Sequence, residues 1–138
     1  MFLGAVTFST MLVTLGINAP ATPAVYRKLH QVEIQILEQT NARRRAHGIT
    51  PLTIDANLLA STRLHAAWMT RNQTLQHTSA AVAENIAMGQ RSAAEVVADW
   101  MSSPGHRANM LRPGHRRIGV AAYVTPGGTI YWCQQFLE

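Results

Sequence analysis

Apolar residues recur with a helical period in the first half of the chain, and this pattern predicts two helices. Spacings of three or four residues predict a first helix over residues 25–46, which Gly48 ends. The residues that carry this pattern are Val25, Leu29, Val32 and Ile36. A second helix is predicted over residues 55–72, with Asp55 as its N-cap. Its predicted buried positions include Leu58, Leu59, Trp68 and Met69.

Two helix-start signals follow one another closely in the middle of the chain. Ser92 and Glu95 form a capping-box pattern ahead of an apolar run, which predicts a short third helix. Ser103 and Pro104 supply a second start, with serine as N-cap and proline at the first helical position. Residues 73–83 show no helical period, so a loop or a short strand is expected there.

Strict alternation of side chains near the C-terminus predicts a β-hairpin. Residues 118–124 and 130–136 alternate with period two, and a turn is expected at residues 126–128, Pro-Gly-Gly. Helices that come first and an antiparallel hairpin that comes last are typical of an α+β domain, not of a parallel α/β sheet.

The composition indicates one globular domain whose stability comes from its core. The chain has 138 residues and a single cysteine, Cys133, so an intrachain disulfide framework is excluded. Basic clusters at residues 27–28, 43–45 and 116–117 contribute to a net charge of +5 and are interpreted as solvated faces. An alternative is a basic surface that binds an anionic envelope or nucleic acid. Nucleic acid is not the favoured partner, because the zinc-finger, RNA-binding and basic-zipper motifs are absent from the sequence.

The first 24 residues have the composition of a leader. Residues 1–17 are apolar and almost uncharged, and small residues that suit a cleavage site follow them up to Ala24. We therefore expect a signal peptide over residues 1–24, a single domain over residues 25–138, and a secreted or cell-envelope location. The apolar stretch is too short and interrupted for a stable transmembrane span. An uncleaved membrane anchor is the alternative.

Three polar residues within thirty positions are the candidate chemistry. His77, Glu84 and His106 supply two imidazoles and a carboxylate that a fold can gather into one cleft. By themselves these residue types allow a metal site or an acid/base site.

The segments around these residues resemble the bacterial branch of the CAP superfamily (cysteine-rich secretory proteins, antigen 5 and pathogenesis-related 1 proteins). The resemblance covers about residues 37–136. The most specific motif is Ser-Pro-Gly-His-Arg-Ala-Asn-Met-Leu at residues 103–111. The others are Leu-Gln-His at 75–77, Ala-Glu-Asn-Ile-Ala at 83–87, Ile-Gly-Val at 118–120 and Tyr-Trp-Cys-Gln-Gln-Phe at 131–136.

This resemblance implies a three-layer α-β-α sandwich with a small antiparallel sheet and a cleft lined by two histidines and two acids. Carried over, the histidines are His77 and His106, and the first acid is Glu84. The second acid falls at Ser103, which carries no carboxylate; Asp99, one helical turn earlier, is a substitute to consider. A divalent, zinc-like cation is expected at His77 and His106, held weakly.

Each of these residues also has a purely structural interpretation. Glu84 is expected to anchor a loop if it is not a catalytic base, and His65 is interpreted as a core or supporting histidine. Three further histidines are assigned to the surface: His30, His47 and His115. Cys133 is interpreted as a small buried hydrophobe.

The missing second acid favours a binding module over an enzyme. The first hypothesis is a secreted domain whose cleft takes a divalent cation and a small apolar or envelope-derived ligand. The alternative is a metal-assisted peptide or ester hydrolase, in which Glu84 acts as general base on water polarised by an ion at His77 and His106.

Overall fold

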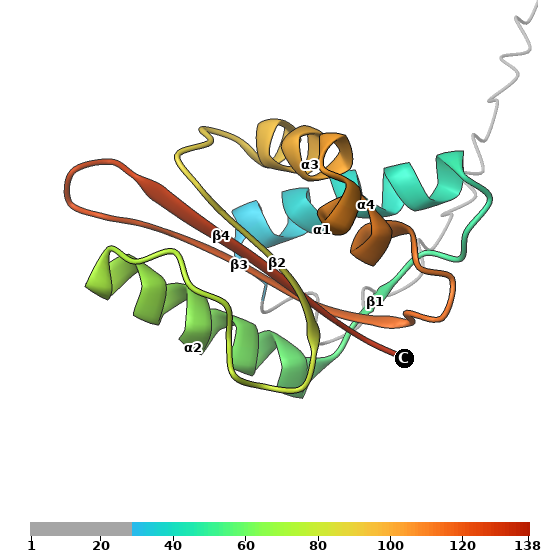
Figure 1. The fold of residues 1–138 in the computed structure, drawn as a ribbon, viewed down its shortest axis with the longest axis horizontal. Helices are drawn as coiled ribbons and strands as arrows, with labels where there is room; N and C mark the ends of the chain where they lie inside the picture. Colours follow the sequence, from blue (N-terminus) through green and yellow to red (C-terminus); the bar gives the residue numbers. More distant parts are fainter. Residues whose placement is uncertain (1–28) are drawn as a thin grey trace, which may run out of the picture.

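The computed structural model describes residues 29–138 (Figure 1). The predicted leader over residues 1–24 and the predicted helix start at residue 25 lie outside the described residues. Within the described part of the chain, every helix is too short or too polar to cross a membrane.

A four-stranded sheet with the order β1-β3-β4-β2 forms the middle of the molecule. The predicted hairpin is confirmed as β3 (Arg117–Val124) and β4 (Ile130–Leu137), which pair antiparallel along their whole length. Strand β2 (Ala83–Met88) adds antiparallel to β4, and the two-residue β1 (Thr53–Ile54) pairs parallel to β3. The sheet is therefore mixed, and not purely antiparallel as expected.

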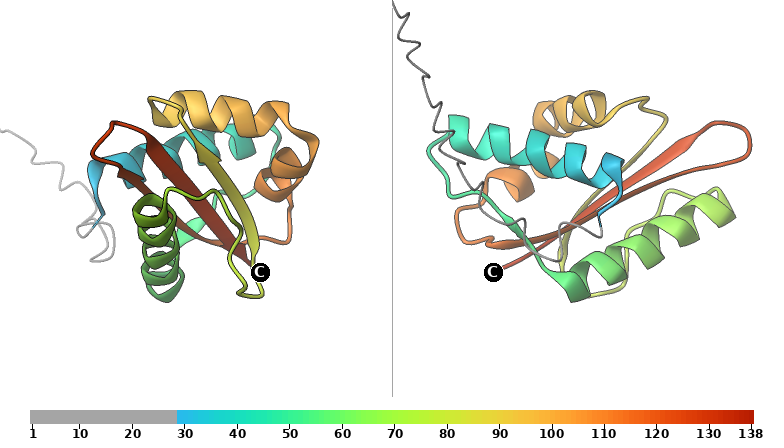
Figure 2. Two further views of the ribbon diagram at one scale, coloured as in Figure 1. Left: turned by 60° about the vertical axis from the view of Figure 1, so that its left-hand side comes forward. Right: turned by 180° about the vertical axis from the view of Figure 1, so that it is seen from behind.

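Helices cover both faces of this sheet, which confirms the three-layer α-β-α sandwich (Figure 2). Helices α1 (Gln31–Ala46), α3 (Ala93–Ser102) and α4 (Pro104–Leu111) lie on one face, and α2 (Ala56–Asn72) lies on the other. Strand β4 is buried on both sides because its side chains alternate between two cores. Trp132 and Phe136 enter the core under α1 and α3, whereas Tyr131 and Cys133 enter the core under α2.

The helix predictions are confirmed in type, and the structure corrects their details. Helix α1 begins at Gln31 with His30 as N-cap, so Leu29 precedes the helix that was expected to contain it. Asp55 caps α2 as predicted, accepting a 2.9 Å hydrogen bond from the Leu58 N–H. Trp68 was predicted to be buried, but it is 37% exposed because it lies at the edge of the face that α2 turns to the sheet.

The two short helices follow their start signals closely. Ser92 accepts a 3.1 Å hydrogen bond from the Glu95 N–H, while the Glu95 carboxylate accepts from the N–H of Arg91 instead of Ser92. Ser103 occupies the N-cap position of α4, but its side chain makes no capping hydrogen bond.

Arg44 contradicts the interpretation of the arginine clusters as solvated faces. Its side chain is fully buried, and its guanidinium donates to four carbonyl oxygens. Those acceptors belong to Thr50 (2.8 Å), Met110 (2.7 Å), Arg112 (3.0 Å) and His115 (3.0 Å). The end of α4 and the turn after it are thereby fixed to α1, which sets where α4 presents its first turn.

Candidate functional site

The buried carboxylate of Glu84 fixes the loop that follows α2. Glu84 is the second residue of β2, and its side chain faces α2. Its Oε1 atom accepts a 2.8 Å hydrogen bond from Nδ1 of His77 and a 2.9 Å hydrogen bond from the N–H of Thr78. Residues 73–82 are therefore held against the edge strand at these two adjacent residues.

The second oxygen of Glu84 is engaged from the sheet. Gln135 on β4 donates from Nε2 to Oε2 at 2.7 Å, and the thiol of Cys133 approaches the same oxygen at 3.6 Å. Nε2 of His65 on α2 lies 3.7 Å from Oε2 and donates a 2.7 Å hydrogen bond to the carbonyl of Gln76. Both carboxylate oxygens are thus already occupied by protein groups.

These contacts also decide the ionisation of Glu84. Burial raises its pKa, but the hydrogen bonds from Gln135, Thr78 and His77, together with the charge of His65, outweigh burial, so its pKa lies below the ordinary value. A carboxylate that is this acidic is ionised at neutral pH and has little tendency to take up a proton.

His77 is oriented by the carboxylate while its ring remains accessible. Its side chain is 63% exposed, and the ionised carboxylate requires a proton on Nδ1. In the neutral ring the lone pair is then on Nε2, which has no hydrogen-bond partner among the described residues. A carboxylate that orients a histidine in this way is the usual arrangement behind a metal-ligating imidazole.

His106 reaches the same region from the first turn of α4. Asn85 on β2 donates from Nδ2 to the carbonyl of His106 at 3.0 Å, and Asn109 donates to Oδ1 of Asn85 at 2.9 Å. The pKa of His106 is lowered, first by burial and then by the positive charge of His77. His77 and His106 are thus both held by residues of β2, His77 through Glu84 and His106 through Asn85.

The structure does not support Asp99 as a replacement for the missing acid. Asp99 accepts a 3.0 Å hydrogen bond from Nε2 of Gln90, which follows the far end of β2. Gln90 is six residues after Glu84 in the sequence, which corresponds to about 20 Å of extended chain, so Asp99 is held away from Glu84. Ser103 is half-buried at the start of α4, three residues before His106, and its hydroxyl makes no hydrogen bond to the described residues.

One histidine was assigned wrongly. His115 was expected on the surface, but it is 4% exposed and stacks on Phe136 with ring centroids 5.1 Å apart. Its Nδ1 atom bonds the carbonyl of Asn109 at 3.0 Å, and burial lowers its pKa. A short turn between arginines carries no hydrophobic period, so this burial is not signalled in the sequence.

The polar residues on β4 were missed for a different reason. Gln134 and Gln135 are both fully buried; Gln135 bonds Glu84, and Gln134 bonds Asn85. Two adjacent glutamines inside an otherwise apolar strand are the signal that a buried polar network lies on both faces of the sheet. Cys133 is buried as expected, and its pKa is raised well above the ordinary value by burial and by the nearby Glu84 charge.

Residues 37–136 match the family model for CAP, the cysteine-rich secretory protein family. The chain belongs to this family. It is 35% identical over 137 residues to the uncharacterised protein YkwD of Bacillus subtilis, an alignment that covers 87% of this chain and 50% of YkwD. The chain thus spans about half the length of that relative.

Solved structures share the CAP fold at low sequence identity. An extracellular protein of Bacillus anthracis with an SCP domain has a TM-score of 0.70 at 23% identity, over 87% of this chain and 45% of that chain. NaASP2, solved with Zn²⁺, has a TM-score of 0.63 at 12% identity, over 78% of this chain and 80% of that chain. These similarities place the Glu84 region of this chain within a CAP fold.

Proposed function

We propose that this CAP domain is an exported, non-enzymatic binding module. Its cleft, formed by His77, Glu84, Ser103 and His106, takes a divalent cation and a small apolar or envelope-derived ligand. The observation that carries the proposal is the state of Glu84, whose two oxygens are saturated by protein donors.

The two imidazoles suit a weakly held cation. His77 keeps Nε2 available because Glu84 engages Nδ1, and the ring of His106 makes no hydrogen bond to any described residue. The lowered pKa of His106 favours the neutral ring that a metal requires. Among the described residues there is no group of three or more His, Cys, Asp or Glu side chains that could hold a metal ion, so water would complete the coordination. The presence of Zn²⁺ with NaASP2 suggests zinc as the first ion to test.

Saturation of Glu84 argues against the hydrolase alternative. A general base must accept a proton from water, but a lowered pKa makes Glu84 a weak base, and a reacting water would compete with His77, Thr78 and Gln135 for its oxygens. Ser103 stands where the second acid is expected, so the cleft has no second carboxylate that could act as a base. Activation of water by a bound ion would therefore lack a base within the cleft.

Export is supported by the leader composition and by the descriptions of related proteins. Residues 1–24 have the pattern of a signal peptide. The structural relative from Bacillus anthracis is described as extracellular. Ligands in the cell envelope are therefore the first candidates for the cleft.

Calorimetric titration of the full chain with Zn²⁺ tests the metal site. We expect weak one-to-one binding that His77→Ala and His106→Ala each abolish, and that weakens as the pH falls through the imidazole range. His30→Ala is the matched control, because this exposed histidine lies at the start of α1, away from the cleft. Binding that survives both cleft substitutions, or no binding by the parent chain, would contradict the metal site.

A hydrolysis screen separates the module from the alternative enzyme. We expect no turnover of peptide or ester libraries with or without Zn²⁺. Zinc-dependent hydrolysis that Glu84→Gln abolishes would overturn the proposal in favour of the hydrolase. Envelope binding that falls steeply with salt and ignores His77→Ala would instead indicate a basic anion-binding surface.

A further inference from the structure

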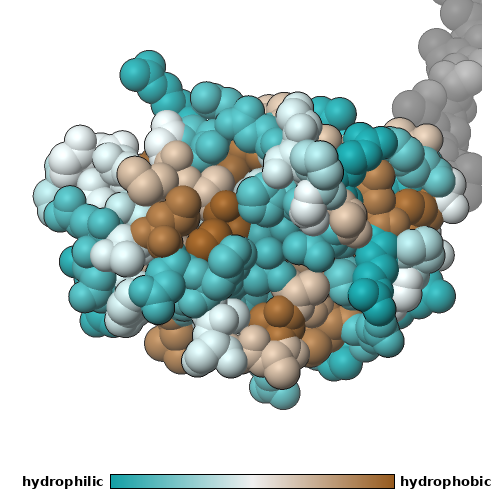
Figure 3. All heavy atoms as spheres, viewed as in Figure 1, coloured by the Kyte–Doolittle hydropathy of each residue, from teal (hydrophilic) through white to brown (hydrophobic). Residues whose placement is uncertain are grey.

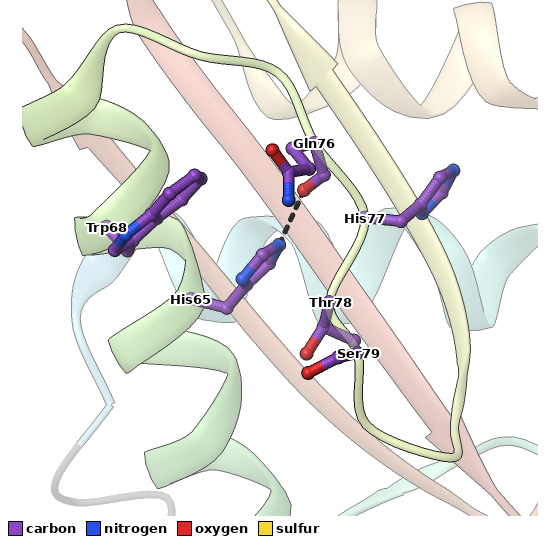
Figure 4. Close-up of a pocket in the computed structure, with 6 residues that line it drawn as sticks. All are labelled: His65, Trp68, Gln76, His77, Thr78 and Ser79. Carbon is purple, nitrogen blue, oxygen red and sulfur yellow. Dashed lines mark hydrogen bonds between the residues drawn. The ribbon is translucent and has the colours of Figure 1, made fainter.

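A pocket lies between α2 and the loop that follows it (Figure 4). It has a volume of about 300 Å³ and is lined by His65, Trp68, Gln76, His77, Thr78 and Ser79. The ring of His77 points away from Trp68 in this view, toward β2. His77 is thus shared between this pocket and the proposed cation site, while the other five lining residues belong to the pocket alone.

Trp68 differs from the other two tryptophans of the chain. Trp100 and Trp132 are 1% exposed, and their indole N–H groups donate to the carbonyls of Ile86 (3.3 Å) and Gln90 (3.1 Å). Trp68 is 37% exposed, and its indole N–H has no partner among the described residues. An open indole face with a free donor at its edge is suited to a ligand that is apolar on one side and polar around its rim.

A second ring is stacked against the Trp68 indole. The imidazole of His65 is nearly parallel to the Trp68 indole, at an interplanar angle of 6° and a centroid separation of 6.1 Å. His65 is held in place by its 2.7 Å hydrogen bond from Nε2 to the Gln76 carbonyl, which leaves Nδ1 of the neutral ring as an acceptor. Since both rings are fixed from one helix, the platform exists before any ligand arrives.

The rest of the lining is polar but carries no carboxylate, lysine or arginine. The side chains of Gln76 and Ser79 make no hydrogen bond to the described residues. The Thr78 hydroxyl oxygen accepts a 3.2 Å hydrogen bond from the Ala80 N–H and keeps its own proton to donate. The pocket therefore offers several uncharged donors and acceptors beside an aromatic surface.

We infer that this pocket binds a neutral sugar ring. A pyranose presents an apolar face of C–H groups that can lie on Trp68, and a rim of hydroxyls that can bond Gln76, Thr78 and Ser79. An anion would find no arginine or lysine in the lining and a cation no carboxylate. A long alkyl chain would leave these polar groups unpaired. The site goes beyond the proposed cation site, shares only His77 with it, and does not require a bound cation.

Titration with N-acetylglucosamine, followed by the indole N–H signals in NMR, tests this inference. The full chain is kept in a chelator, so that the His77–His106 cleft cannot contribute through a metal. We expect the Trp68 indole signal to shift with millimolar affinity while the signals of buried Trp100 and Trp132 stay in place. Trp68→Ala should abolish binding, whereas Leu64→Ala, one turn earlier and 73% exposed, should leave it unchanged.

Substitutions in the polar lining provide an independent readout. Thr78→Val and Ser79→Ala should each weaken sugar binding severalfold, because each removes a hydroxyl that lines the pocket. No Trp68 shift at tens of millimolar sugar would overturn the inference. So would a Trp68 shift produced by hexanol but not by the sugar, since the pocket would then be an apolar slot.

Discussion

The imidazole of His77 and the carboxylate of Glu84 are joined by a 2.8 Å hydrogen bond, although His77 is 63% exposed and Glu84 is buried. An accessible loop residue thus takes its orientation from a residue inside the sheet. Because the same carboxylate bonds Gln135 on β4, the position of His77 depends on the register of the two strands.

Replacing Glu84 by glutamine should weaken both the fold and the cation site. The amide keeps the shape but loses the charge that attracts His77 and Gln135, so the free energy of unfolding should fall by about 1–3 kcal/mol. Zinc affinity should fall about tenfold, because His77 is no longer held in one tautomer. Urea unfolding and calorimetric titration measure these two effects.

The pH dependence of that variant provides a further check. The lowered pKa of Glu84 means that its stabilisation is present above the ordinary value of 4.5 and is lost as the pH falls through the lower folded value. The difference between the parent and Glu84→Gln should therefore shrink in acid. Glu38→Gln, at an exposed position on α1, should change neither property.

Arg44→Lys should destabilise the protein strongly even though the charge is kept. A lysine ammonium cannot reach the four carbonyls that the guanidinium serves, so buried acceptors lose their partners, at a cost of about 3 kcal/mol. Chemical denaturation measures the loss, and Arg45→Lys on the exposed side of α1 is the control. Equal effects of the two substitutions would contradict the role assigned to Arg44.

Gly119 lets α2 approach the sheet closely, so Gly119→Ala should be destabilising. A Cβ atom at this position would lie 2.6 Å from the Leu58 carbonyl oxygen and collide with the Thr62 hydroxyl. We expect a loss of about 1–3 kcal/mol, because helix backbone cannot move away without disturbing the core. Gly105→Ala on α4, with open space around the new methyl, should be neutral or slightly stabilising in the same thermal-unfolding assay.

Stability should decline in mild acid because of two histidines. Burial is the first cause of the lowered pKa values of His106 and His115, so near the ordinary value of 6.5 the unfolded chain binds more protons than the folded one. The free energy of unfolding should therefore fall as the pH drops from about 7 to about 5. His115→Phe, which keeps the ring on Phe136, should reduce the slope, and an unchanged slope would contradict this assignment.

Helical spacing alone could not place Trp68 on the surface. On the face seen in Figure 3, apolar side chains occur in small patches between hydrophilic ones. A residue at helical spacing from the core positions of α2 looks buried in the sequence, yet a rotation of a few tens of degrees moves it to the rim. The helix was therefore predictable, whereas the accessibility of one indole at its edge was not.

Sequence motifs correctly predicted the helix starts and the hairpin, because these features depend on interactions between residues that are near in the sequence. The cap of α2 at Asp55, the proline start of α4 and the alternating hairpin depend on contacts within a few residues, and the sequence alone determined them. The CAP motifs contain His77, Glu84 and His106, and that these three residues form a functional site stays a prediction.

Long-range burial was decided only by the tertiary structure. Arg44 and His115 are polar residues whose neighbours in the sequence are also mostly polar. They are buried because α4 and the turn after it pack across α1 and β4. Strand β2 carries Glu84 and Asn85, so its sequence lacks the apolar alternation that predicts a strand. Its two polar side chains are stable inside the protein because Gln135 and Gln134 on β4 bond them. Buried polar groups of this kind are stable only when groups from distant segments of the chain form hydrogen bonds with them. The spacing of residues in the sequence does not show which distant segments will come into contact.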